Sequence, residues 1–230
     1  PKNWAKDAIL TSQIGKALDA TPDQPDLVFT VSVQGHGKYP TEQVLENPAI
    51  TVTACPEGTN RNALEYYVNQ VHEMDAFLRN LLNMLSQREE RTILVLYGDH
   101  LPALDLEGRN MSSRSLYKTE YVIWDNFHLE KADEDLCAYQ LAAAALNRIG
   151  ITTGVMNAFQ QFCREESTYA SDLLKLQYDA LYGKNYLHGG ASPYEPTDMQ
   201  MGMAPITVSS IVQQGEEIWY VLGENFSPYC

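Results

Sequence analysis

The stretch TILVLYGDHLPAL, residues 92–104, decides the fold expected of this sequence. Its first half is almost wholly apolar and rich in β-branched residues, a composition typical of a buried β-strand. The apolar run ends abruptly at Gly98, and Asp99 and His100 follow side by side. Because near-continuous apolar strands are typical of sheets covered on both faces by helices, residues 92–97 predict a strand of an α/β fold with two polar side chains at its carboxyl end.

A second apolar segment and a long helical pattern precede this stretch. Residues 26–33, DLVFTVSV, have the β-branched and aromatic composition of a buried strand. They lead into QGHGKYP, where two glycines flank His36. Residues 62–87 carry apolar side chains at helical spacing. The order strand, helix, strand indicates a mostly parallel sheet flanked by helices, with a short β segment at the C-terminal end of the chain.

The remaining pattern divides the chain into a main body, a linker and a short module. Residues 1–182 form the expected main body, and residues 183–204 have the glycines, prolines and weak periodicity of a linker. Residues 205–230 predict two strands of a small β module that is truncated before it closes; their end, VLGENFSPY, is similar to the opening of an immunoglobulin-like module. Further elements are expected as helices over 4–18, 133–148, 155–164 and 170–182 and as a strand over 119–126.

The composition excludes several classes of protein. Sixteen basic and thirty acidic residues give a net charge of −14, with no lysine or arginine cluster, so nucleic acid is not expected as a partner. An anionic substrate would need a metal ion or a local cationic pocket to overcome this charge. The longest apolar runs fall short of the ~20 residues that span a bilayer. The four cysteines show no metal-binding spacing and leave the redox compartment open, with a Cys137–Cys163 pair as one alternative.

The residues themselves indicate where chemistry could occur. In parallel α/β sheets, ligands bind beyond the carboxyl ends of the strands, where His36, Asp99 and His100 are all expected. A carboxylate and a neutral imidazole are suitable ligands for zinc or manganese. An aspartate after a strand is also a common turn former, and a single histidine is commonly structural. The residue types therefore leave a metal site and a purely structural role open.

Three segments together resemble a known family. FTVSVQGHGKYP at residues 29–40, NALEYYVNQVHEMDAFLRNLL at 62–82 and RTILVLYGDHLPAL at 91–104 are similar to the lipoteichoic acid synthase-like sulfatases of the alkaline phosphatase superfamily. They occur in the family's order, and the resemblance covers about residues 20–185. It implies the C-terminal portion of a catalytic domain with a partial alkaline phosphatase or sulfatase-like fold.

The resemblance also implies roles for single residues. It makes Asp99 and His100 ligands of a divalent metal ion, manganese above zinc, magnesium or calcium, and it places His36 against the transferred phosphoryl group. Arg109 and Arg114 are candidates for contacts to an anionic substrate, with solvated loop arginines as the alternative. Asp75 aligns with an acidic position of the family, where a buried carboxylate bonded to loop backbone is expected rather than a ligand. The nucleophile, a threonine or a modified Cys or Ser, is expected upstream and outside this chain.

The function implied is that of an extracytoplasmic, metal-dependent phosphoglycerol transferase or sulfatase-like enzyme. Such an enzyme would act at the extracellular face of a bacterial cell membrane, anchored by upstream segments, on an anionic lipid-linked or ester substrate. The expected partner is the missing N-terminal half of the same protein, and the isolated chain is expected to be inactive. The alternatives are hydrolysis of a sulfate ester or another phosphodiester, and a non-catalytic cell-surface binding module.

Overall fold

The computed structural model describes residues 5–191, 206–215, 218–224 and 226 of the chain. These residues form two compact units, which lie within Pro1–Ile151 and Thr152–Cys230. The division into residues 1–182, 183–204 and 205–230 stays a prediction, and the part of the linker over 192–205 lies outside the described residues. All the residues that the sequence singles out for chemistry fall in the first unit.

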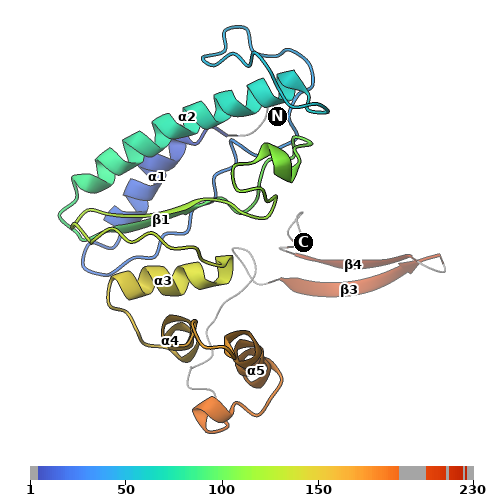
Figure 1. Cartoon of the computed structure of the whole chain (residues 1–230). Coiled ribbons are helices and arrows are strands. Elements are labelled where there is room, and N and C mark those ends of the chain that lie inside the picture. The colour runs from blue at the N-terminus through green and yellow to red at the C-terminus, as the bar shows by residue number, and fades with distance from the viewer. Residues whose placement is uncertain (1–4, 192–205, 216–217, 225, 227–230) are drawn as a thin grey trace. The chain divides into compact units, whose positions relative to one another are not determined.

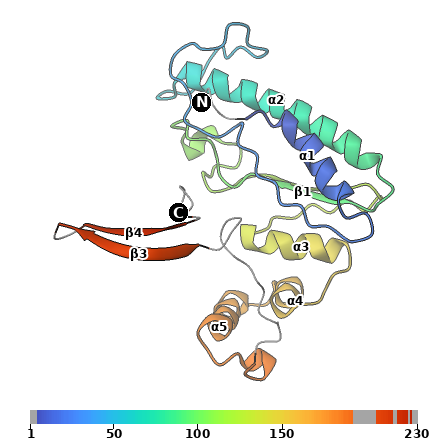
Figure 2. The ribbon, with the colours of Figure 1, turned by 180° about the vertical axis from the view of Figure 1, so that it is seen from behind.

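The core of the first unit lies under two helices, α1 (Ala8–Asp19) and α2 (Arg61–Ser86), which confirm two predicted helices. Figures 1 and 2 show both helices on the same side of strand β1 (Ile93–Tyr97). Apolar side chains from the helices and strands form one cluster, whose burial stabilises the unit. Its buried members are Leu18, Phe77, Leu81 and Leu85, and Leu10, Ile14, Leu78, Met84, Leu94 and Trp124 pack against them.

The sheet of this unit is antiparallel. Strand β1 pairs with β2 (Tyr121–Asp125), so that Ile93 lies opposite Asp125 and Tyr97 opposite Tyr121. The parallel sheet predicted from the sequence is not found, because both sheets among the described residues are antiparallel pairs. Between β1 and β2 the chain forms only the short helix η1 (Gly108–Asn110). A parallel pair needs a long crossover, usually a helix, and no such helix connects these strands.

Residues 26–33 do not form the buried strand that their composition predicts. No strand is assigned to them, and no described strand pairs with them. The side chains of Leu27, Phe29 and Val31 are 96%, 76% and 64% exposed. Every residue from 26 to 32 is exposed, so the apolar side chains of this segment face solvent and not a core. The prediction was wrong because a strand needs a neighbour for its hydrogen bonds, and an apolar sequence does not say whether that neighbour is present.

The helices after β2 are the last elements of the first unit and the first elements of the second. The helix predicted over 133–148 is shorter than expected: η2 (Ala138–Gln140) leads directly into α3 (Leu141–Arg148), and residues 133–137 are not helical. In the second unit, α4 (Val155–Phe162) and α5 (Tyr169–Leu181) confirm two predicted helices. A further short helix, η3 (Tyr186–His188), lies in the expected linker. No described helix is long and apolar enough to cross a membrane.

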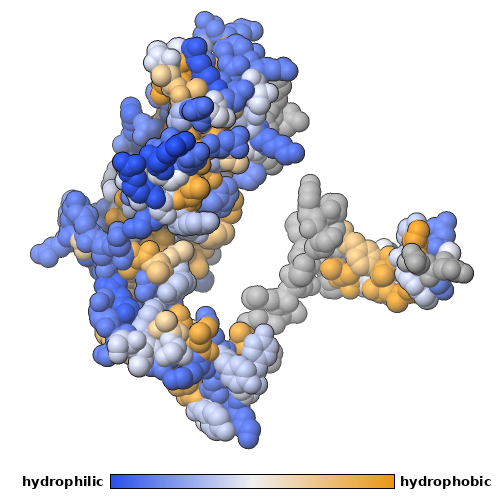
Figure 3. All heavy atoms as spheres, turned by 45° about the vertical axis from the view of Figure 1, so that its right-hand side comes forward, coloured by the Kyte–Doolittle hydropathy of each residue, from blue (hydrophilic) through white to orange (hydrophobic). Residues whose placement is uncertain are grey.

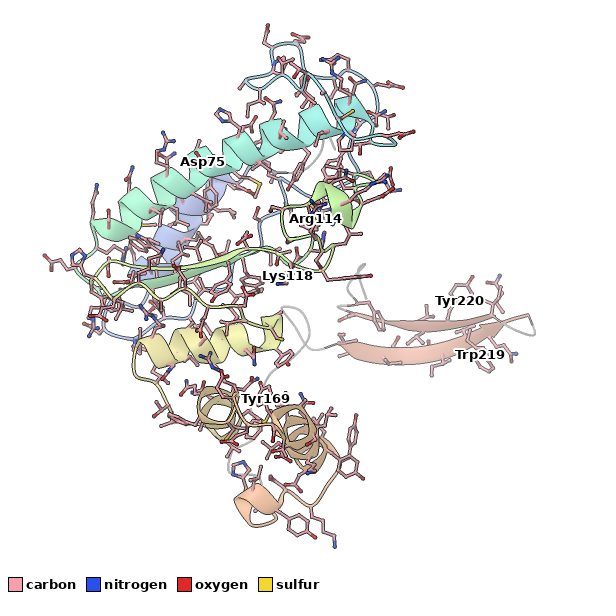
Figure 4. The ribbon with its side chains drawn as sticks, in the orientation of Figure 1. Asp75, Arg114, Lys118, Tyr169, Trp219 and Tyr220 are labelled. Atoms are coloured by element: carbon pink, nitrogen blue, oxygen red, sulfur yellow. The ribbon has the colours of Figure 1, made fainter. Side chains whose placement is uncertain are left out.

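A hairpin forms the last part of the second unit that the structure describes. Strand β3 (Thr207–Gln214) pairs antiparallel with β4 (Ile218–Glu224), which confirms the two predicted strands. Every residue of both strands is exposed. Figure 3 shows hydrophobic surface over the hairpin, and Figure 4 shows Trp219 and Tyr220 on opposite faces of β4. The hairpin therefore carries apolar side chains on both faces without a core of its own.

The cysteines do not crosslink the described part of the chain. Cys55, Cys137 and Cys163 are free, so the Cys137–Cys163 pair considered from the sequence is not found. The thiol of Cys55 donates a hydrogen bond to the Thr59 carbonyl oxygen at 3.4 Å. The stability of the described residues therefore rests on packing and hydrogen bonds.

Candidate active site

Three segments of the first unit meet around a cavity of about 340 Å³. They are the loop over residues 36–41, the beginning of α2, and the loop over residues 100–105. The lining includes His36, Lys38, Tyr39, Asn60, His100 and Asp105. The two loops expected to carry the chemistry thus share one site, although only the second of them follows a strand.

Gln34 fixes the start of the first of these loops, directly after residues 26–33. Its side chain is buried, with 4% exposed. The amide oxygen accepts a hydrogen bond from the Asp7 backbone N–H at 2.8 Å, and the amide nitrogen donates to Gln70 Oε1 at 3.2 Å. A buried amide that lost these partners would carry a desolvation cost, so the hydrogen bonds hold this position strongly. Gln34 lies two residues before His36 and ties its loop to both helices.

Tyr39 fixes the other end of the same loop. Its hydroxyl donates a hydrogen bond to the Gly35 carbonyl oxygen at 2.8 Å, and its ring meets the Tyr67 ring edge-on at a centroid distance of 5.4 Å. Burial and, secondly, the nearby Tyr67 raise the pKa of Tyr39 to about 12. The phenol therefore stays protonated at neutral pH and acts as a donor that closes the loop, not as a base.

The second loop is fixed at Gly98, directly after β1. The Gly98 backbone N–H donates to the Glu120 carbonyl oxygen at 3.2 Å, and the Thr119 hydroxyl donates to the Gly98 carbonyl oxygen at 2.6 Å. A Cβ atom on Gly98 would lie 3.4 Å from Thr119 Cβ, which is tighter than ordinary packing. The residues before β2 thus hold the turn that presents Asp99 and His100.

His36 and His100 lie together in the wall of the cavity, as predicted. Their ring centroids are 6.1 Å apart, with the rings edge to face. Each Nδ1 lies at a backbone carbonyl oxygen, 2.6 Å from that of Gly37 for His36 and 2.9 Å from that of Leu101 for His100. A carbonyl oxygen can only accept, so Nδ1 carries the proton of each neutral ring and Nε2 carries the lone pair. This is the tautomer that binds a metal ion or accepts a proton through Nε2.

Asp99 supplies a carboxylate next to this imidazole. Its Oδ1 lies 3.7 Å from His100 Nε2 and accepts a hydrogen bond from the His100 backbone N–H at 2.9 Å. The carboxylate is 80% exposed, so burial does not oppose its charge. These two donors fit part of a divalent-metal site. No group of three or more His, Cys, Asp or Glu suited to a metal occurs among the described residues, so further ligands are needed to complete the shell.

Asp75 does not have the buried position predicted for it. Its carboxylate is 69% exposed and pairs with Arg79 Nη2 at 3.4 Å, one helical turn further along. Figure 4 shows Asp75 on the outer side of α2. The side chains of α2 that face the core nearby are Phe77 and Leu81. Asp75 is therefore an exposed ion-pair residue, neither a ligand nor a buried acceptor.

Arg109 and Arg114 lie outside the cavity lining. Arg109 Nε pairs with the Glu107 carboxylate at 2.8 Å, and Arg114 Nη1 donates to the Arg109 carbonyl oxygen at 3.2 Å. Figure 4 shows Arg114 at the loop around η1. Their contact with substrate stays a prediction, and in this structure both arginines contribute to the shape of their own loop.

The lining residues that the sequence reasoning did not single out include Lys38, Asn60 and Asp105. Lys38 lies in the same glycine-containing loop as His36, and its position there was the available signal. Asn60 caps α2 by accepting a hydrogen bond from the Ala63 backbone N–H at 3.0 Å, so its cap position could have placed it at the helix start. Asp105 has a positive φ of 53° and no sequence signal that points to the cavity.

Comparison with known proteins identifies the family. The sequence model of the Sulfatase family matches residues 1–161. The chain belongs to the sulfatase family. This match confirms the resemblance inferred from the three motif segments, and it gives the first unit a sulfatase-like fold of the alkaline phosphatase superfamily.

The sulfatase-family chain is also similar to a solved structure and to a curated protein. The structure is Streptococcus pyogenes phosphoglycerol transferase GacH in complex with sn-glycerol-1-phosphate, with 27% identity and a TM-score of 0.50 over 56% of this chain and 37% of that chain. The curated protein, from Rhizobium meliloti (strain 1021), is named for cyclic beta-1,2-glucan modification and is 30% identical over 138 residues, 54% of this chain. The chain spans about a fifth of that relative, 21% of its length.

Proposed function

We propose that the chain is the C-terminal part of the catalytic domain of an extracytoplasmic, metal-dependent phosphoglycerol transferase. The observation that carries this proposal is the meeting of His36 and His100 in one cavity wall, with ring centroids 6.1 Å apart, although they lie far apart in the sequence. The similarity to a phosphoglycerol transferase supports phosphoryl transfer as the reaction class. The location at the outer face of a bacterial membrane rests on the resemblance to lipoteichoic acid synthases.

Each candidate residue has a separate role in this proposal. Asp99 and His100 would hold a divalent ion, for which manganese is the first candidate. When bound there, the ion would stabilise negative charge that develops on the transferred group. His36 contacts the phosphoryl oxygens and orients the group, and its loop is held by Gln34 and Tyr39 on either side. This rigid support suits a group that must be placed to within fractions of an ångström.

The apolar segment over residues 26–33 supports the proposal that further parts of the catalytic domain complete the site. Leu27, Phe29 and Val31 are largely exposed, and the segment has no partner strand among the described residues. An exposed apolar segment without a partner strand is suited to pairing with a neighbouring strand. We expect this neighbour, the nucleophile and the remaining metal ligands to come from upstream sequence of the same protein.

The acceptor of the transferred group has two candidates. Phosphatidylglycerol as donor and a glycerophosphate polymer as acceptor follow from the family resemblance. The relative named for cyclic glucan modification favours a glycan as a second candidate acceptor. Hydrolysis of a sulfate ester or phosphodiester is the alternative reaction, since the same metal-binding residues serve both.

The test uses the gene product that contains this chain together with the coding sequence upstream of Pro1. With manganese and a phosphatidylglycerol analogue, His36→Ala and His100→Ala should each lower the rate at least ~100-fold, the scale of losing one preorganised contact. His72→Ala is the matched control, because His72 is an exposed histidine of α2 outside the cavity lining.

Parallel assays with an aryl sulfate and with a glucan acceptor separate the alternatives. Faster turnover of the sulfate ester would replace transfer by hydrolysis. Metal-dependent turnover by the 230-residue chain alone that His100→Ala abolished would show that the nucleophile lies within these residues. A protein whose activity survived both histidine substitutions would overturn the proposal.

A further inference from the structure

Lys38 is a cation of the cavity wall that has no described counter-ion. It lines the cavity together with His36 and His100. No hydrogen bond or ion pair joins its side chain to a described residue. In a chain with a net charge of −14, acidic partners are abundant. A lysine that lines a cavity without such a partner keeps its ammonium group available to a ligand.

Other lysines of the first unit show the contrast. Lys6 pairs with Glu73, and Lys118 pairs with Asp135 at 3.5 Å. Lys16 also lacks a described ion pair, but it lies in the last turn of α1, where the C-terminal dipole of the helix favours a positive charge, and it does not line the cavity. Lys38 has neither an acidic partner nor a helix end to account for its position.

The backbone that carries Lys38 is held in place. Tyr39, the next residue, bonds back to the Gly35 carbonyl oxygen at 2.8 Å, and Gln34 is tied to the Asp7 backbone N–H at 2.8 Å. The loop between these anchors is short, so Lys38 leaves the backbone at a fixed point beside His36. The Lys38 side chain is exposed, and it lines the cavity from this point together with His36.

The charges of the cavity wall decide what such a lysine can bind. Asp105 also lines the cavity and opposes anions. Lys38 is the only lysine or arginine among the lining residues that the structure describes. Phosphate oxygens bind an ammonium group through charge-assisted hydrogen bonds, which are stronger than those to a neutral donor.

We propose that Lys38 is a substrate-binding residue that contacts the phosphate oxygens of a phosphate ester and makes the cavity prefer anionic to neutral polyols. The choice of a glycerol phosphate as the ester rests on the proposed function. The phosphate could belong to a soluble glycerol phosphate or to a phosphatidylglycerol headgroup. Both present the same oxygens to Lys38, and the experiment separates them.

The experiment follows backbone amide NMR shifts of residues 35–39 and 100–105 in the 230-residue chain during titration with sn-glycerol-1-phosphate. We expect saturation with a dissociation constant of about 1–10 mM, as for a single charge-assisted contact in open solvent. Lys38→Met should weaken binding about tenfold, and Lys38→Arg should retain most of it, since Arg keeps the charge. Glycerol should not bind in this range.

Two further variants test the sign of the effect. Lys16→Met removes the same charge from outside the cavity and should leave the dissociation constant unchanged. Asp105→Asn removes the opposing carboxylate and should tighten binding about threefold. Vesicles of phosphatidylglycerol, with phosphatidylcholine as control, form the second arm. Lys38-dependent binding in either arm supports the proposal and identifies the source of the phosphate.

The outcomes separate this inference from the proposed function. Absence of binding in both arms up to about 50 mM phosphate, or binding that Lys38→Met leaves unchanged, overturns the role of Lys38. Transferase activity of the longer protein could stand without it. Conversely, Lys38-dependent binding in a longer protein that transferred no phosphoglycerol would support the anion site and reject the proposed function.

Discussion

The two halves of α2 bury opposite kinds of side chain. The C-terminal half buries Phe77, Leu81 and Leu85 in the apolar cluster. The N-terminal half buries Glu65, Asn69 and Gln70, which are 4–6% exposed. One helix thus builds the core at one end and, at the other, holds the backbone of residues 50–52 and the side chain of Gln34.

The polar half acts through backbone groups of distant residues. Glu65 Oε2 accepts a hydrogen bond from the Val52 backbone N–H at 2.9 Å. Asn69 exchanges two hydrogen bonds with the backbone of Ile50, at 3.0 Å and 2.8 Å. Buried polar groups stay stable only with such partners, so these residues fix the loops rather than add apolar burial. The comparison teaches that separate stretches of the same helix support the apolar core and the loop before the helix.

The largest effect is expected in the apolar half. Leu81→Ala should lower the free energy of unfolding by about 2–5 kcal/mol, because Leu81 is 2% exposed and its removal leaves a cavity in the cluster. Urea unfolding measures this change. Val71→Ala is the control, since Val71 lies on the same helix with 41% exposed, and its cost should be well below that of Leu81→Ala. Equal costs would mean that the apolar cluster is not the main support of the unit.

The next effect is expected in the polar half. Glu65→Ala should lower the free energy of unfolding by about 1–3 kcal/mol, because it leaves the buried Val52 N–H without an acceptor. Glu65→Gln keeps an amide oxygen at the same place and should restore part of the loss. Glu57→Ala, in an exposed loop, is the control. Unlike Leu81→Ala, Glu65→Ala should also shift the amide NMR signals of residues 50–52. Unchanged signals there would contradict the claim that the polar half of α2 holds this loop.

A smaller effect depends on pH and involves Tyr39, whose ring meets that of Tyr67 in the polar half of α2. Burial raises the pKa of Tyr39 to about 12, against ~10 for a tyrosine in the unfolded chain. The neutral phenol is therefore favoured by folding. Its contribution is fully present below pH ~10 and is lost as the pH rises toward 12. The stability advantage of the natural protein over Tyr39→Phe should shrink between pH 9 and pH 12, and a constant difference would show that the phenol is not buried in solution.

The smallest effect is expected where the two halves meet on the solvent side. Asp75→Ala should change the free energy of unfolding by less than about 0.5 kcal/mol, because exposed ion pairs contribute little. The Asp75 and Arg79 side chains are 69% and 73% exposed. Unfolding at low and high salt should give the same small difference for the variant. A cost above 1 kcal/mol would mean that Asp75 has a partner beyond Arg79.

The sequence predicts some parts of this arrangement because their signals are local. The apolar run before Gly98 identified β1, and the residues that follow its end placed His100 in the site. The apolar composition of residues 26–33 predicted a buried strand but could not say whether a partner strand lies beside it. The polar half of α2 was also missed, because Glu65 and Asn69 bond to backbone groups 13 and 19 residues away. Periodicity describes which face of a helix is apolar, not which distant backbone groups its polar residues meet.

The exposed hairpin also determines what an optical probe of this protein would report. Of the three tryptophans, Trp124 packs against the buried cluster of the first unit, whereas Trp219 is 60% exposed on β4. A two-stranded ribbon without a core opens at little free-energy cost, while Trp124 stays in place until the cluster itself comes apart. Intrinsic fluorescence should therefore contain a red-shifted component from Trp219 that hardly responds to the main unfolding transition. The Trp219→Phe substitution should remove this component and leave the Trp124 signal, which follows the core.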